Sequence, residues 1–106
     1  MSRKVVDESF FLRRQLTEAA RGNPDACFEL GLHYAYGADA DGADYIEAHK
    51  WFNIAAMSGD RRAQECRAEL ASEMSPQEIA DAQRAARAWL SLRASGCPAR
   101  RSRRTR

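Results

Sequence analysis

Glycine and proline divide this chain of 106 residues into five short segments, and each segment carries its apolar residues at helical spacing. Glycines follow four of the segments, where helices commonly end, and prolines open two of them. Short helices joined by tight turns predict an all-α fold of stacked antiparallel hairpins. The predicted helices span about residues 8–21, 24–36, 45–58, 61–73 and 76–95, after a flexible N-terminus of residues 1–7.

The helix starts are marked by capping residues. Ser75-Pro76-Gln77-Glu78 is a capping box with proline at the first helical position, and Asn23 and Asp60 precede two other helices as caps. The faces expected to be buried are Leu12, Leu16, Ala19 and Ala20 in the first helix, Ala63, Cys66, Leu70 and Met74 in the fourth, and Ile79, Ala82, Ala86, Trp89 and Leu90 in the fifth.

Small and aromatic residues follow a fixed order through the second and third segments. The order is Ala26, Phe28, Leu30, Gly31, Tyr34 and Gly37, followed by Asp44, Tyr45, Ala48, Trp51, Phe52, Ala55, Ala56 and Gly59. This stretch, about a third of the chain, resembles one full Sel1-like repeat. It departs from the family in the loop, where Asp39 stands in place of a second glycine, Gly42 is displaced and one residue is inserted.

The resemblance implies an α–α superhelix, a short solenoid of the Sel1 and tetratricopeptide kind. The full repeat would cover about 24–59, partial repeats would flank it within a domain of 8–96, and the helix at 76–95 would cap it. A bacterial interaction scaffold without chemistry of its own is also implied. Its repeat core would consist of Leu30, Gly31, Tyr34, Ala48, Trp51, Phe52, Ala55 and Ala56.

Positive charge is concentrated at the end of the chain, where five arginines lie in residues 100–106. Without them, 12 basic residues stand against 15 acidic ones, so the body is net negative. Residues 97–106 have no apolar periodicity and are predicted to form a disordered basic tail. Either this tail is only a solvated end, or it binds nucleic acid or another anionic surface through counterion release.

The apolar runs and cysteines bear on the compartment. The longest unbroken apolar run is Ile54–Met57, far short of the roughly 20 residues of a membrane span, and no signal peptide fits the N-terminus. We therefore expect a cytoplasmic protein without membrane contact. Three cysteines without a CxxC pair argue against a disulfide framework, and Cys27 and Cys66 are expected to pack as small hydrophobes.

The search for catalytic chemistry finds no phosphate-binding glycine loop and no metal-ligand spacing. His33 and His49 are expected at the surface or at a hairpin edge. The alternative is that one of them pairs with Cys27 or Cys66 as base and nucleophile, or joins a metal site. We expect a protein that is not an enzyme and has no cofactor or metal.

The second helix has more apolar surface than one hairpin needs. Besides its repeat-core face, it carries a second apolar face in which Phe28, Leu32 and Tyr36 are the candidate partner-binding residues. A helix or extended peptide of a partner could dock there. The alternative is that this face packs on the first or fourth helix of the same chain.

The sequence therefore predicts a non-catalytic adaptor that binds another protein of unknown identity. A nucleic-acid-associated factor that uses the basic tail, or a regulatory subunit of an enzyme, are the alternatives. Because solenoid repeats bury their faces against neighbours, either the end helices act as caps or the protein self-associates. The fifth helix is expected to lie across the fourth.

Overall fold

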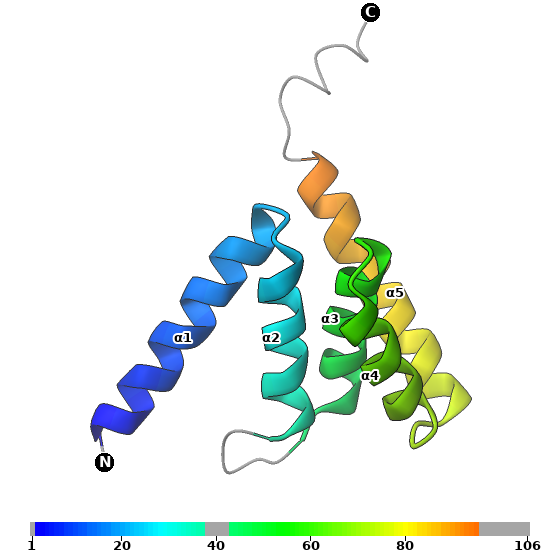
Figure 1. Cartoon of the computed structure of the whole chain (residues 1–106), viewed down its shortest axis with the longest axis horizontal. Helices are drawn as coiled ribbons and strands as arrows, with labels where there is room; N and C mark the ends of the chain where they lie inside the picture. Colours follow the sequence, from blue (N-terminus) through cyan, green and yellow to red (C-terminus); the bar gives the residue numbers. More distant parts are fainter. Residues whose placement is uncertain (1, 38–42, 96–106) are drawn as a thin grey trace, which may run out of the picture.

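The computed structural model describes residues 2–37 and 43–95, and the side chains of 10–37 and 43–93. The described residues form five helices and the turns between them, which confirms the all-α prediction. The chain reverses direction at each turn, so consecutive helices are antiparallel (Figure 1). The helices are α1 (Ser2–Ala20), α2 (Pro24–Ala35), α3 (Tyr45–Met57), α4 (Arg61–Ala71) and α5 (Pro76–Ser95).

The first helix is longer than the sequence suggested. We expected residues 1–7 to be flexible, but α1 begins at Ser2 and includes residues 2–7. The other four helices begin at the predicted residues, and three of them, α2, α4 and α5, follow the predicted caps. Among the described residues, no helix combines the length and apolar character that crossing a bilayer requires.

Side-chain caps explain these helix starts. Asn23 accepts a hydrogen bond from the backbone N–H of Asp25 (3.0 Å), and Asp60 accepts one from Ala63 (3.2 Å). At the start of α5 the predicted capping box forms in both directions. The Glu78 N–H donates to Ser75 Oγ (3.1 Å), and the Ser75 N–H donates to Glu78 Oε1 (2.9 Å). These bonds satisfy backbone donors that have no partner within the helix.

The central helix is α3, which packs on α2, α4 and α5, while α1 packs on α2. Small residues dominate the core, so the helices can approach closely. Of the predicted repeat core, Tyr34 is half-buried and the other members are buried. The core residues are Ala19, Ala26, Cys27, Leu30, Ala48, Trp51, Phe52, Ile54, Ala55, Ala56, Ala63 and Ala86.

The tightest approach joins α2 to α3 at Gly31. A Cβ atom at this position would lie 2.4 Å from Cε1 of Phe52, well inside van der Waals contact. The aromatic ring therefore lies directly against the α2 backbone, and only glycine leaves room for it.

The place of α5 differs from our expectation. We expected α5 to lie across α4, but it packs mainly on α3. The ring of Trp89 meets that of Trp51 edge to face, with centroids 5.1 Å apart, and Ala82 and Ala86 are fully buried. Covering the indole of Trp51 removes a large apolar side chain from water, which favours this place for α5.

Candidate functional site

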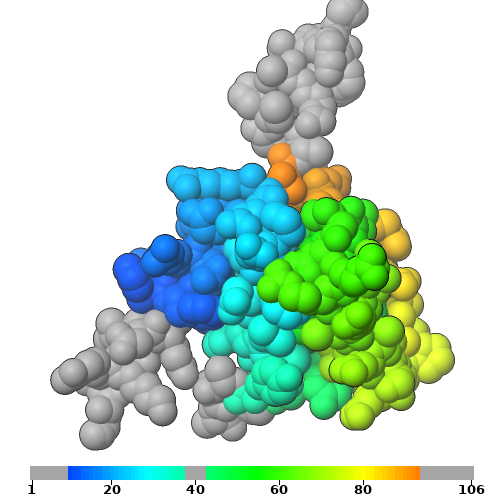
Figure 2. Space-filling model, viewed as in Figure 1, coloured from blue at the N-terminus to red at the C-terminus, as the bar shows by residue number. Residues whose placement is uncertain are grey.

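A groove of about 270 Å³ opens between α2, α3 and α4, on the face seen in Figure 2. We call it the α2–α4 groove. It is smaller than the roughly 300–1,000 Å³ of typical small-molecule pockets, so it suits a few side chains better than a whole ligand. Its lining consists of Leu32, Ala35, Tyr36, Tyr45, Phe52, Cys66, Glu69, Leu70 and Glu73.

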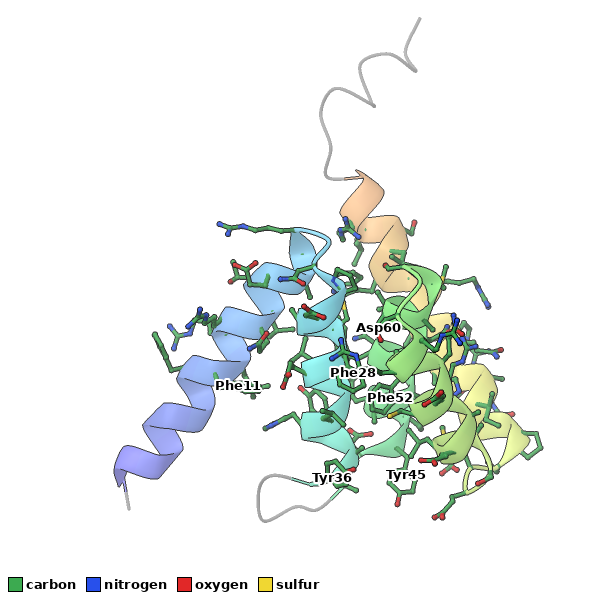
Figure 3. All side chains as sticks on the ribbon, in the orientation of Figure 1. Phe11, Phe28, Tyr36, Tyr45, Phe52 and Asp60 are labelled. Carbon is green, nitrogen blue, oxygen red and sulfur yellow. The ribbon has the colours of Figure 1, made fainter. Side chains whose placement is uncertain are left out.

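Two of the three predicted partner-binding residues lie in this groove. Leu32 lines it, and Tyr36 stands beside it with 79% of its surface exposed. Figure 3 shows Tyr36 and Tyr45 at the same end of the molecule, where α2 ends and α3 begins. A tyrosine exposed to this degree contributes little to the core and is available for contact.

Phe28 is placed differently. The ring centroid of Phe28 lies 5.8 Å from that of Phe52 (Figure 3). The guanidinium carbon of Arg62 lies 4.2 Å from the same Phe28 centroid. Phe28 does not line the groove. For this residue the structure therefore favours the alternative of packing within the chain.

Arg62 joins the start of α2 to the start of α4. Its Nη2 lies 2.7 Å from Asp25 on α2 and 2.7 Å from Asp60, the cap of α4. The hydrogen-bonded guanidinium lowers the pKa of Asp60 below its ordinary value. These contacts link the two helices at the surface, and because exposed ion pairs add little stability, α4 is held mainly by its packing on α3.

The charges that line the groove are all negative. Glu69 and Glu73 lie four residues apart on α4, so their side chains share one helix face. Both are exposed, and among the described residues neither carboxylate has a hydrogen bond or an ion pair. The groove thus combines apolar side chains with an acidic wall, formed by the unpaired carboxylates of Glu69 and Glu73. The apolar pattern of α2 alone did not reveal this wall.

The two described cysteines are free but not activated. Burial raises the pKa of Cys27 to about 11, although Arg93 offsets part of this effect. Burial, together with the charge of Glu69, also raises the pKa of Cys66 in the groove. Since the thiolate is the reactive form, both side chains are poor nucleophiles near neutral pH.

The prediction that His49 lies at the surface or at a hairpin edge is wrong. This side chain is 2% exposed, and among the described residues its Nδ1 has no hydrogen-bond partner. Burial and the nearby charge of Arg67 lower its pKa, so the imidazole is neutral. Its spacing of three residues from Phe52 and seven from Ala56 places it on the buried side of α3.

His33 is half-buried between aromatic side chains. Its ring centroid lies 5.8 Å from that of Phe11 and 5.1 Å from that of Tyr34. Among the described residues, no hydrogen bond joins His33 or His49 to Cys27 or Cys66, as a base and its nucleophile would require. Within residues 10–37 and 43–93, no three His, Cys, Asp or Glu side chains gather where they could hold a metal ion.

A second hollow, of about 220 Å³, lies where α1 ends and α5 passes α3. We call it the Arg93 hollow. Arg93 Nε donates a 3.0 Å hydrogen bond to the Ala20 carbonyl at the end of α1. This bond satisfies a carbonyl that α1 itself leaves free and fastens α5 to α1. The lining of the Arg93 hollow consists of Ala19, Gly22, Cys27, Ile54, Met57, Ser58, Leu90 and Arg93.

Two sequence features fall outside the described residues. They are the basic tail at 97–106 and the loop substitution at Asp39. Comparison with protein-family models, with curated proteins and with solved structures finds no match. The Sel1-like resemblance therefore stays a hypothesis based on the residue pattern.

Proposed function

We propose that this protein is a non-catalytic protein–protein interaction module whose partner docks in the α2–α4 groove. The observation that carries the proposal is Tyr36, which stands 79% exposed beside an apolar groove. Aromatic side chains at such places are frequent anchors of binding energy. Grooves of this form receive the apolar face of a helix or the alternate side chains of an extended peptide.

The chemistry of the remaining side chains supports a binding role over a catalytic one. The raised pKa values of Cys27 and Cys66 keep both thiols protonated. His49 is buried and neutral, so it is poorly placed to exchange protons with a substrate. Catalysis by a nucleophile needs an activated group next to a base, and these residues offer neither.

The Sel1-like hypothesis is compatible with the same proposal. Contact of Gly31 with Phe52, and burial of Ala48 and Trp51, are what a repeat of this kind requires of those positions. In a short solenoid, α2 and α4 would be the inner helices and the groove would lie on the concave side.

Affinity purification with groove variants tests the proposal. Proteins that copurify with the wild type should be lost with Tyr36→Ala and Leu32→Asp, while helical content and melting temperature stay close to wild type. Leu92→Ala is a matched control, because Leu92 is 72% exposed on α5 and lies outside the groove. Retention of the same partners by both groove variants, or their loss with Leu92→Ala, would contradict the proposal.

A further inference from the structure

We infer that the occupant of the α2–α4 groove is a segment of another protein that combines apolar side chains with lysine or arginine. This inference rests on the proposed function and adds the chemistry of the partner. It follows from the shape of the groove, the sign of its charges and the pairing of the charges around it.

The shape selects a short apolar anchor. Leu32, Ala35 and Leu70 line the groove together with the buried ring of Phe52. A volume of about 270 Å³ holds a few side chains and excludes a folded surface or a large cofactor. A single segment fits this space when its apolar residues lie on one side, as in an amphipathic helix or a strand.

The acidic wall selects a cationic neighbour for that anchor. Glu69 and Glu73 are the charged residues of the groove lining, and they lie on one face of α4. Among the described residues no cation pairs with either carboxylate: Arg62 binds Asp25 and Asp60, and Arg67 donates to Asn53 at 2.6 Å. A lysine or arginine of the partner can therefore pair with Glu69 or Glu73 without breaking a contact inside the chain.

The same charges argue against two other occupants. Nucleic acid is repelled, because its phosphates would face the two unpaired carboxylates. The chain's own residues 97–106 carry five arginines but no large apolar side chain. They supply the charge without the anchor, so a peptide of these residues serves as a comparison in the test.

Fluorescence polarisation with the full chain tests the inference. The probes are labelled leucine–lysine peptides in which two leucines stand at i,i+2, i,i+3 or i,i+4 and lysines flank them. We expect saturable binding by at least one of them. Three comparison peptides should each bind at least about five- to tenfold more weakly. The first has glutamate in place of lysine, the second has alanine in place of leucine, and the third has the sequence of residues 97–106. Binding should also weaken as salt is raised.

Charge-neutral variants locate the effect. The double variant with Glu69→Gln and Glu73→Gln should bind the leucine–lysine peptide about five- to tenfold more weakly than the wild type does. Glu29→Gln with Glu65→Gln is the matched control, because both residues are exposed and lie outside the groove lining. This control should bind as the wild type does.

Three results would overturn the inference: no binding by any leucine–lysine peptide, equal binding by the glutamate peptides, or equal affinity of the two double variants. The proposed function fails separately. If Tyr36→Ala still abolishes capture of copurifying proteins, the groove remains a docking site and only the cationic chemistry of its partner is wrong.

Discussion

Trp51 and Phe52 are neighbours in the sequence and both are 2% exposed, yet they belong to two regions of the molecule that are covered differently. The Trp51 side of α3 is closed by the chain itself, because α5 lays Trp89 against it. The Phe52 side is covered in part by Phe28 and otherwise opens on the α2–α4 groove. One helix thus serves both folding and recognition, and the difference depends on what the chain places over each side.

This difference separates stability from binding. Side chains in the closed region should change the free energy of unfolding when they are altered. Side chains that line the open groove should change affinity for a partner and leave unfolding almost unchanged.

Trp51→Ala should lower the free energy of unfolding by about 3–5 kcal/mol, because it leaves a cavity between α3 and α5. That is a large share of the roughly 5–15 kcal/mol typical of a small domain. Urea denaturation followed by circular dichroism measures the loss, with Leu92→Ala on the exposed side of α5 as control. An unchanged midpoint would mean that α5 does not close this region.

Gly31→Ala should cost about 1–2 kcal/mol, because the new methyl group would meet the Phe52 ring at 2.4 Å. This loss would come in spite of the higher helix propensity of alanine. Combining the change with Phe52→Leu should cost less than the sum of the two single changes, since the smaller side chain makes room. A G31A variant as stable as the wild type would show that the two helices can separate freely.

Acid should lower the free energy of unfolding through His49, which is buried on α3. Its pKa is lowered in the folded chain, so the unfolded chain, with the ordinary value of 6.5, binds the proton more readily. Stability is therefore unaffected above that pH and falls as the pH drops below it. Thermal melts between pH 7.5 and 5 should show the decline, and His49→Leu should reduce it. Equal slopes in the wild type and His49→Leu would exclude His49 as the cause.

Tyr36→Ala should change the free energy of unfolding by less than about 0.5 kcal/mol, the usual range for an exposed side chain. Urea denaturation beside Trp51→Ala gives the comparison directly. A loss of several kcal/mol would place Tyr36 in the core and remove the distinction between the two regions.

The sequence predicted local structure well, because local chemistry determines it. The starts of α2 and α4 follow from Asn23 and Asp60, whose side chains satisfy backbone N–H groups within the next turn. The place of α5 could not be predicted the same way. Periodicity identifies a buried face but does not say which neighbour covers it.

Only the α2 residues of the candidate site could be predicted from the sequence. Leu32 and Tyr36 were identified because α2 carries a surplus apolar face. Glu69 and Glu73 lie more than thirty residues further along the chain, and only the packing of α2 and α4 on α3 brings them to the groove. Their role depends on tertiary structure, which no local pattern of α4 contains.

Chemical-shift mapping shows residue by residue whether the α2–α4 groove binds the peptide. A ¹⁵N-labelled full chain is titrated with a leucine–lysine peptide, and the amide resonances that move are assigned. The account predicts saturable shifts at the α2–α4 groove, at Leu32, Ala35, Tyr36 and Leu70, that are lost in Tyr36→Ala. Shifts concentrated at the Arg93 hollow, or shifts that persist unchanged in Tyr36→Ala, would contradict it.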